Sequence, residues 1–557
     1  MSILTLKKEQ IYLAIVKALQ QGRSKGQLVF QELPDFTLEM PREKAHGDFA
    51  TNVAMLLSKE NRLAPRQIAQ IILDNFANIQ QWLEKVEIAG PGFINFYLGT
   101  DWLYQVLPQV IEEDEKYGNS NFGKGQRIQV EFVSANPTGL LHMGNARGAA
   151  LGDTLCNVLA ATGFEVTREF YVNDAGNQIE NFGKSLEARY LQLLGQEVDF
   201  PEEGYHGEDI IESVRNLIAE MGDKYLKVES DLRREFLIQK ALGEKLSKIK
   251  QDLASFGVEY DIWFSEQSLH ESGAITRNIQ ELQQKGFIYE KEGALWFKTT
   301  ELGEEKDEVL VRSNGLATYF AADIAYHNHK FERGFEKVIN IWGADHHGHV
   351  ARMKGAMQAL GYNPDNLHVI LMQLVRLFQS GEIVRMSKRS GQYITLSELI
   401  EEVGRDAARY FFVMRSPDSH LDFDLDLAKA ESADNPVYYV QYAHARINSI
   451  LQASTEKLTG SEEVEFSLLK AEEELALLRK IAEFPDELVG VAVSYEPHHL
   501  TRYAHELASL FHSFYNSCRV LTDEAELRRA RLCLVNAARI TLRNVLLLLG
   551  VSAPKKM

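Results

Sequence analysis

A strand, helix and strand pattern that begins at Arg127 constrains the fold more than any other feature. The run RIQVEFVS is typical of a buried strand, and a loop with Pro137 and Gly139 leads into a helix rich in small residues over Asn145–Ala161. A second strand is expected at Val166–Val172. This order predicts parallel pairing, because a crossover helix returns the chain to the same end of the sheet. We therefore expect an α/β domain of the nucleotide-binding type.

The chain is too long for a single hydrophobic core, so several domains are expected. It has 557 residues, whereas single cores stop growing at roughly 250 to 300 residues. Residues 1–118 begin with a helical pattern and contain VEIAGPGFINFYL, which predicts two strands around a Gly-Pro-Gly turn in a small α+β domain. Residues 119–428 make up the α/β domain, and residues 429–557 have the pattern of a separate all-α domain.

The strand pattern of the α/β domain is interrupted once. A charged, helical insertion is expected at about 180–275. The sheet pattern then returns at Ala294–Lys298, Lys337–Trp342 and Leu367–Leu374. We expect the sheet to close near residue 380.

Composition excludes several classes of protein. The hydrophobic content of 45% and charged content of 25% are those of an ordinary globular protein. A formal charge of -19 argues against non-specific binding of duplex DNA, which needs a basic surface. It leaves room for a local basic patch that faces RNA. No apolar run has the form of a signal peptide or of a membrane span, so a cytoplasmic protein without a membrane partner is expected.

The loop and helix start Ala135–Asn145, with the sequence ANPTGLLHMGN, have the features of a phosphate site. Free backbone amides and the positive end of the helix dipole attract an anion there. His142 can donate a hydrogen bond to a phosphate oxygen, and Gly144 can let a flat base lie against the backbone. Taken alone, the pattern is also that of a helix cap with a satisfied histidine.

A second motif, RMSKRSG at 385–391, forms a glycine-flanked loop with three positive side chains. Such a loop can neutralise the charge that builds on a triphosphate during displacement. A run of charge is also typical of a solvated loop. The order of the two motifs favours the functional interpretation, because together they resemble the HIGH and KMSKS signatures of class I aminoacyl-tRNA synthetases.

The resemblance narrows to the bacterial arginyl-tRNA synthetase family. It is carried by the strings VEFVSANPTG, YVNDAGNQ, IWGADHHGH, YYVQYAHAR and GVSAPKKM, and it covers nearly the whole chain. It implies a Rossmann-like catalytic domain, an additional N-terminal domain that touches the outer corner of tRNA, and a helical anticodon-binding domain. It also implies an arginine–tRNA ligase that acts in translation, with ATP, L-arginine and tRNA(Arg) as partners, and a monomer is expected.

The resemblance assigns catalytic roles to His142, Asn145 and Lys388. Asn145 stands where HIGH has its second histidine, and Arg385 stands where KMSKS has its first lysine. The second substitution leaves open how much Arg385 contributes. The implied ATP-binding residues are Ala135, Asn136, Pro137, Thr138, Gly139, Leu140, Leu141, His142, Met143, Gly144, Asn145, Gly343, Asp345, His346, Arg385, Met386, Ser387 and Lys388.

The choice of amino acid depends on acidic side chains. Arginine carries a planar cation with five donors, so its pocket needs carboxylates and neutral acceptors. Tyr319 and Asp323 lie four residues apart in a helical stretch and therefore share one face. The residues implied to bind arginine, by resemblance, are Glu131, Ser134, Asn136, His142, Tyr319, Asp323 and Asp345.

No zinc site is expected. Histidines that bind a metal on a helix recur at i and i+4, unlike those of the cluster GADHHGH, and the three cysteines have no paired spacing. Cys156, Cys518 and Cys533 are therefore expected in the core. The only metal expected is Mg²⁺ carried with ATP.

Aromatic and polar side chains interleave on the helix that follows residue 435. Such groups can stack on unpaired bases, although helical packing explains about half of them equally well. We expect tRNA contacts from Tyr438, Tyr439, Gln441, Tyr442, His444 and Arg446.

Two alternatives remain open. A non-catalytic RNA-binding relative could keep the fold, since fold does not guarantee function. Retention of His142, Gly144 and Lys388 argues against it. A class I synthetase for cysteine or glutamate is disfavoured by the acidic pocket and by the lack of zinc cysteines.

Overall fold

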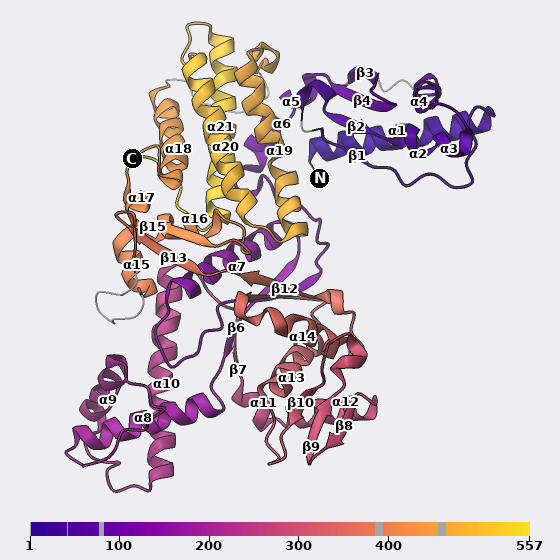
Figure 1. The fold of residues 1–557 in the computed structure, drawn as a ribbon. Helices are drawn as coiled ribbons and strands as arrows, with labels where there is room; N and C mark the ends of the chain where they lie inside the picture. Colours follow the sequence, from indigo (N-terminus) through magenta and orange to yellow (C-terminus); the bar gives the residue numbers. More distant parts are fainter. Residues whose placement is uncertain (1, 42, 77–82, 385–393, 455–463) are drawn as a thin grey trace.

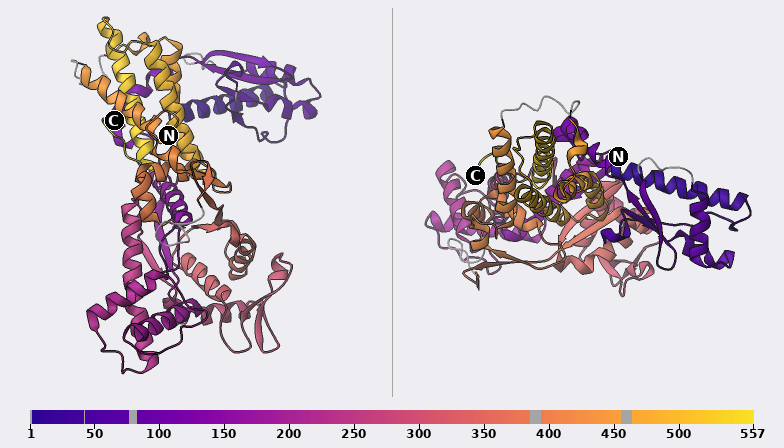
Figure 2. Two further views of the ribbon diagram at one scale, coloured as in Figure 1. Left: turned by 60° about the vertical axis from the view of Figure 1, so that its left-hand side comes forward. Right: turned by 90° about the horizontal axis from the view of Figure 1, so that it is seen from above.

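The computed structural model describes residues 2–41, 43–76, 83–384, 394–454 and 464–557. Figure 1 shows the predicted architecture: an α/β domain with a parallel sheet, between an N-terminal α+β domain and a C-terminal bundle of helices. The N-terminal domain projects sideways from the C-terminal helices like an arm, and both views in Figure 2 show the same projection. The predicted fold class is confirmed.

The N-terminal domain packs helices on a four-stranded antiparallel sheet with the order β1-β2-β4-β3. The predicted Gly-Pro-Gly turn joins its last two strands, and Gly92 there has a φ of +144°, which favours glycine. A side chain at Gly92 would also clash, because its Cβ would lie 2.6 Å from that of Pro65. The elements are α1 Ile3–Ser24, β1 Leu38–Glu39, β2 Phe49–Thr51, α2 Val53–Leu56, α3 Ser58–Asn61, α4 Pro65–Asp74, β3 Leu83–Ala89 and β4 Phe93–Leu98, followed by α5 Asp101–Tyr104 and α6 Val106–Glu113.

The central sheet has five parallel strands in the order β12-β11-β5-β6-β7. The chain builds outward from β5 through β6 to β7, and then returns to the other side of β5 with β11 and β12. The strand order therefore reverses between β5 and β11, the switch point at which open α/β sheets bind their ligands. The strands are β5 Arg127–Glu131, β6 Glu165–Val172, β7 Ile262–Ser265, β11 Lys337–Gly343 and β12 Leu367–Met372.

The sequence prediction was wrong about two strands. β7 lies inside the predicted helical insertion, yet it pairs in parallel with β6 at the edge of the central sheet. All its residues are only half buried, so it lacks the apolar run that marks an inner strand. Ala294–Phe297, expected in the central sheet, is β9 of a separate antiparallel sheet with β8 Ile288–Lys291 and β10 Glu308–Val311. A short apolar run does not specify its partner strand.

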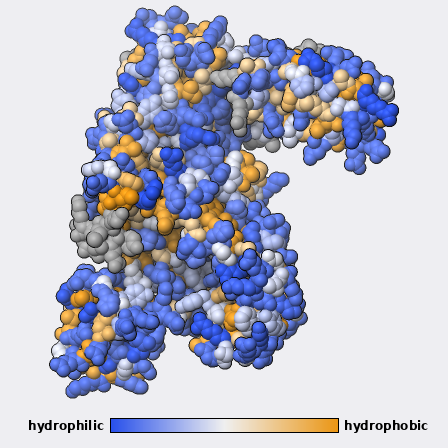
Figure 3. All heavy atoms as spheres, viewed as in Figure 1, coloured by the Kyte–Doolittle hydropathy of each residue, from blue (hydrophilic) through white to orange (hydrophobic). Residues whose placement is uncertain are grey.

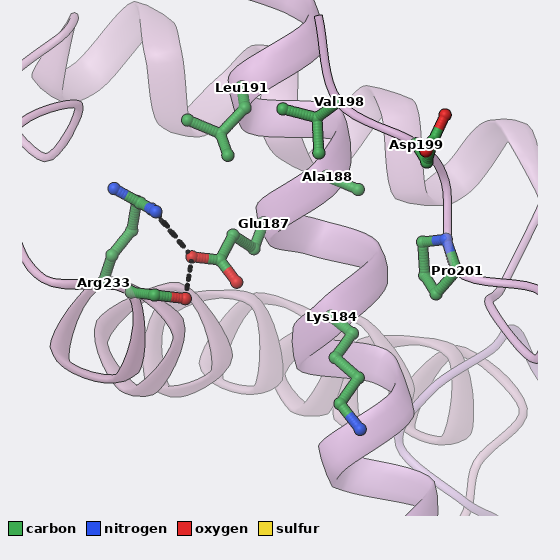
Figure 4. Close-up of a pocket in the computed structure, with 9 residues that line it drawn as sticks. Lys184, Glu187, Ala188, Leu191, Val198, Asp199, Pro201 and Arg233 are labelled. Carbon is green, nitrogen blue, oxygen red and sulfur yellow. Dashed lines mark hydrogen bonds and ion pairs between the residues drawn. The ribbon is translucent and has the colours of Figure 1, made fainter. Parts of the chain in front are cut away.

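The insertion itself folds as three helices around a small core of its own: α8 Asn177–Leu193, α9 Glu208–Met221 and α10 Ser230–Ser255. A buried ion pair joins Arg233 to Glu187 at 2.8 Å. The pocket beside it in Figure 4 is lined by Leu191, Val198 and other residues of the insertion, none of which was predicted to bind a ligand. Figure 3 shows that a notch separates this lobe from the lobe that carries α11 to α14.

Helices pack on the central sheet, and a further set of helices forms the C-terminal domain. Those that follow β5, β10 and β11 are α7 Met143–Ala161, α13 Tyr319–Glu332 and α14 His347–Leu360, while α11 Gln267–Glu271 and α12 Ala274–Gln284 precede β8. A small sheet, β14-β13-β15, is formed by β13 Val375–Gln379, β14 Glu382–Ile383 and β15 Leu421–Asp424, with α15 Leu396–Val403, α16 Arg405–Val413 and α17 Leu425–Lys429 beside it. The long helices of the last domain are α18 Pro436–Ala453, α19 Glu472–Ser494, α20 His498–Ser517 and α21 Ala525–Leu548.

Candidate active site

The loop after β5 contains a strained turn at the switch point of the sheet. Val133 and Ser134 have φ angles of +69° and +39°, which non-glycine residues rarely adopt. The Ser134 hydroxyl donates to Glu131 Oε1 at 2.9 Å and accepts from the backbone N–H of Tyr171 at 3.1 Å. These two hydrogen bonds hold the turn, and strain of this kind is typical of functional sites.

His142 and Asn145 form the predicted cap of α7. The N–H of Gly144 donates to His142 Nδ1 at 3.1 Å, and the N–H of His142 donates to Asn145 Oδ1 at 3.0 Å. The surrounding protein lowers the pKa of His142 by desolvation, which favours the neutral ring. Because Nδ1 accepts a hydrogen bond, the ring proton is assigned to Nε2, the atom that can donate to a phosphate oxygen. Asn145, which stands where the HIGH motif has its second histidine, thus stabilises the turn at the start of α7.

The second signature lies outside the described residues. Arg385, Met386, Ser387 and Lys388 fall in the undescribed range 385–393. The chain that follows it is held beside His142: Leu396 donates its backbone N–H to the carbonyl of Leu141 at 2.8 Å, and Thr395 forms a β-bridge with His142. The chain that leaves the second motif is therefore held next to the first motif, at the start of α7.

The other predicted nucleotide residues lie in the two loops that flank the switch point. Ala135 to Leu141 connect β5 to α7, with Asn136 and Leu140 exposed and Pro137 and Thr138 buried. Met143 and Gly144 begin α7. Across the switch point, Gly343 ends β11, and a Cβ there would lie 2.3 Å from Asp345 Oδ1. The Asp345 side chain is 81% exposed and lies 3.5 Å from His346.

Helix α13 carries the residues predicted to recognise the amino acid. Tyr319 is half exposed at its first position, and a Cβ on Gly176 would lie 3.5 Å from the Tyr319 ring. Asp323 follows one turn later, with its side chain 35% exposed and Oδ2 3.0 Å from Nε2 of His349. The predicted shared face is confirmed by these positions, whereas arginine binding stays a prediction.

A carboxylate that sequence analysis missed lies beside them. Glu266 follows β7 directly and is only 4% exposed. The pKa of its carboxyl is raised to about 7, chiefly by burial and further by the charges of Asp323 and Asp174. A hydrogen bond with the Tyr171 hydroxyl opposes this shift. Three carboxylates therefore share one region. The available signal was the end of a parallel strand, which was hidden because β7 was assigned to the insertion.

Glu131 faces the sheet interior rather than open solvent. It is 6% exposed, and its Oε2 lies 2.5 Å from Nζ of the fully buried Lys330. Its other oxygen accepts the Ser134 hydroxyl. Glu131 therefore lies under the strained turn and supports it, and its contact with arginine stays a prediction.

The residues predicted to contact tRNA divide into two groups on α18. Tyr438 stacks on Tyr442 at 6.2 Å, and the Arg446 guanidinium lies 5.5 Å from the ring of Tyr442. Tyr439 contacts the ring of His505 at 5.0 Å. Gln441 and His444 instead hold the end of the chain: Gln441 donates to the carbonyl of Ser552 at 3.0 Å, and His444, 2% exposed, lies with Nδ1 2.8 Å from the carbonyl of Pro554.

One group of potential metal ligands and three cysteines lie within the described ranges. Glu496, His498 and His499 are the group there that could hold an ion, and they lie at the start of α20, away from the predicted site. Arg502 Nη2 is 2.8 Å from His499 Nδ1, so a cation would meet a positive neighbour. The three cysteines are buried and unpaired, as predicted for core residues. None of the helices in the described ranges has the length and apolar character that a membrane span requires.

Protein-family models match the chain along almost all of its length. They are the arginyl tRNA synthetase N terminal domain at residues 9–98, the catalytic domain of tRNA synthetases class I (R) at 106–449, and the DALR anticodon binding domain at 440–557. The fold with its switch-point loops, taken with these matches, defines a class I aminoacyl-tRNA synthetase.

Individual relatives and solved structures agree. The arginine–tRNA ligases of Moorella thermoacetica and Heliobacterium modesticaldum are 62% and 64% identical, with at least 99% of each chain covered. The structure of Thermus thermophilus arginyl-tRNA synthetase superposes with a TM-score of 0.77 over 99% of this chain and 100% of that one, at 22% identity. The chain belongs to the arginyl-tRNA synthetase family, and its activity is that of an arginine–tRNA ligase, which uses ATP.

Proposed function

We propose that L-arginine binds at the switch point of the central sheet, between the strained turn after β5 and the first turns of α13. The observation that carries this proposal is the convergence of Asp323 and Glu266, two carboxylates from separate elements that lie near enough for the charge of Asp323 to raise the pKa of Glu266. An array of acceptors suits a planar cation with five donors. Tyr319 completes the pocket from the start of α13, and Asn136, Ser134 and Asp345 lie toward the α-amino and carboxylate end.

ATP, with Mg²⁺ on its phosphates, occupies the loop from Ala135 to Asn145 in this proposal. His142 donates through Nε2 to a phosphate oxygen, and the base lies on Gly144. The loop with Gly343 and His346 borders the nucleotide from β11. Lys388, outside the described residues, is the cation expected to approach the leaving pyrophosphate, and Arg385, in place of the first lysine, is expected to hold that loop.

The reaction needs positioning and charge stabilisation rather than an activated protein nucleophile. The arginine carboxylate attacks the α-phosphorus of ATP, and pyrophosphate leaves as the P–O bond to it breaks. A ribose hydroxyl of the terminal adenosine of tRNA(Arg) then attacks the activated carbonyl, and AMP leaves. The neutral His142 fits this role, because it donates a hydrogen bond without having to lose a proton.

In this proposal each domain contacts a different part of the tRNA. Residues 1–118 contact its outer corner, residues 119–428 bind its acceptor end, and residues 429–557 bind its anticodon. On α18, the strip Tyr438, Tyr442 and Arg446 is best placed to stack on unpaired bases. Gln441 and His444 support this surface by holding the end of the chain. A cytoplasmic monomer fits these roles.

The test is aminoacylation by the purified protein with ATP and tRNA, one amino acid at a time. Arginine alone is expected to be charged, because its cation matches Asp323 and Glu266. Efficient charging of any other amino acid would overturn the pocket, and binding of tRNA without charging would favour a non-catalytic relative.

A further inference from the structure

A layer of buried polar side chains lies between α13 and the central sheet. Asn340, Glu131 and Glu169 are neighbours in register across β11, β5 and β6, and they are 0%, 6% and 0% exposed. Helix α13 packs polar groups against these strand residues. Lys330 pairs with Glu131 at 2.5 Å, and Arg333 pairs with Glu169 at 2.7 Å. Apolar residues in such places are often as stabilising as buried ion pairs, so stability alone does not account for this layer. The best-attested use of buried polar groups is to fix the register of packed elements.

Lys330 connects two chains of hydrogen bonds in this layer, which we call its two branches. Its Nζ donates to Glu131 Oε2 at 2.5 Å and to Asn340 Oδ1 at 2.9 Å, and it lies 4.2 Å from the centre of the Tyr326 ring. The side chain is fully buried. Each of its two hydrogen-bonded branches leads to a different wall of the proposed arginine pocket.

The first branch leads to the strained turn. Glu131, held by Lys330, accepts the Ser134 hydroxyl through its other oxygen at 2.9 Å. Ser134 in turn accepts the N–H of Tyr171 at 3.1 Å. The positive φ of Ser134 is thus maintained by a carboxylate that the ion pair with Lys330 holds in place.

The second branch leads to Asp323. Asn340 donates through Nδ2 to Nε2 of His327 at 2.7 Å, and His327 Nδ1 lies 2.8 Å from the carbonyl of Asp323, to which it can donate. Burial holds the pKa of His327 well below its usual range, so the ring is neutral and can accept at one nitrogen and donate at the other. One tautomer of His327, with its proton on Nδ1, therefore satisfies both of its hydrogen bonds in this branch.

We infer that Lys330 is a positioning residue for arginine recognition. It ties the turn at Ser134 and the helix carrying Asp323 to one buried cation, and so sets the distance between the two walls of the pocket. Lys330 itself does not touch the substrate. A displacement of about 1 Å at a binding group can cost a hundredfold in rate, so fixed register has a functional value that burial alone lacks.

The test compares Lys330→Met with Arg333→Met. Both remove one cation of the same layer from the same helix. Arg333, however, pairs with Glu169, and among the described residues it does not bond to Glu131 or Asn340. For Lys330→Met, the Kd of arginine measured by calorimetry and its KM in charging are expected to rise roughly tenfold or more, with the KM of ATP changed less than about twofold. Arg333→Met is expected to lower thermal stability and leave arginine binding unchanged.

A third variant covers the case in which Lys330→Met does not fold. Asn340→Ala cuts only the branch to Asp323 and leaves the Lys330 and Glu131 pair intact, and it is also expected to weaken arginine binding more than ATP binding. Folded Lys330→Met or Asn340→Ala with wild-type arginine affinity would overturn the inference, as would equal weakening by Arg333→Met. The inference rests on the proposed arginine site: if the wild-type protein does not bind arginine the proposed site fails, whereas unchanged binding in the variants refutes Lys330 alone.

Discussion

At the residue scale, the charge of Asp323 is expected to decide affinity for arginine. Asp323→Asn keeps the shape and one acceptor for His349, but it removes a charge partner of the guanidinium. Losing one partner of a desolvated pair costs roughly 2 to 5 kcal/mol, so the KM of arginine should rise at least about thirtyfold. The KM of ATP, measured in the same charging assay, should change far less. Equal effects on both substrates would assign Asp323 a structural role.

Glu266 predicts that arginine binding depends on pH. Its carboxyl has a pKa raised to about 7, chiefly by burial, so a large fraction is protonated in slightly acidic solution. Only the ionised form attracts a guanidinium; arginine affinity should therefore rise with pH up to about 7 and level off above it. Below that pH, binding should release a proton, which calorimetry in buffers of different ionisation enthalpy detects. Glu266→Gln should weaken binding and remove the dependence; a wild-type Kd constant from about pH 6 to 8 contradicts the proposal.

Residue spacing explains which site residues could be predicted. Tyr319 and Asp323 lie one turn apart, and helical geometry puts them on one face without further information. Lys330 and Glu266 could not be found this way, because their roles depend on partners far away in the sequence. An isolated lysine on a helix has no local signature that separates a buried cation from a solvated one.

At the element scale, α7 is pressed against the start of the strained loop through Gly152. A Cβ at Gly152 would lie 2.2 Å from Cγ of Phe132, the residue that follows β5, so Gly152→Ala must push the helix or the ring aside. Overpacking of this kind costs about 1 to 3 kcal/mol, and movement of the ring also disturbs the strained turn. We expect a lower unfolding midpoint and a higher KM for ATP.

The control is Gly148→Ala on the same helix, where a Cβ would meet Met372 at an ordinary 3.7 Å. There the helix propensity of alanine should stabilise by up to about 1 kcal/mol. Comparable destabilisation by both variants would mean that glycine is required along α7 for another reason.

Helices and strands were predicted correctly where the hydrophobic pattern was clear and the segment was long, and wrongly at two short strands. The α7 region and the flanking strands were placed within a few residues, since the buried run and the small-residue helix each have one interpretation. β7 and β9 have only four residues each, and their assignment depends on which strand lies beside them. Pairing is a tertiary property that a local pattern does not contain.

At the scale of the whole molecule, one buried arginine joins the catalytic and C-terminal helical regions. Arg409 on α16 is fully buried and donates to Asp153 of α7 at 2.6 Å, to the carbonyl of Phe256 after α10 at 3.1 Å, and to the carbonyl of Leu549 after α21 at 2.9 Å. Gly550 has a φ of +68°, and a Cβ there would lie 2.2 Å from the Arg409 guanidinium carbon. The chain end is therefore shaped around this side chain.

Arg409→Met should consequently destabilise the protein far more than the loss of an ordinary cation. It leaves the Asp153 carboxylate with the more distant Arg168, at 3.4 Å, and it removes the guanidinium that donates to the buried carbonyls of Leu549 and Phe256. Breaking a buried pair on one side costs about 3 to 5 kcal/mol. Arg405→Met on the same helix is the matched control: Arg405 is 45% exposed and its pair with Asp406 spans 3.4 Å, so its loss should cost less than about 1 kcal/mol. Urea unfolding followed by circular dichroism gives both midpoints. A shift for Arg409→Met no larger than for Arg405→Met would show that the two regions are held together by their apolar packing instead, because the buried hydrogen bonds would then contribute nothing measurable.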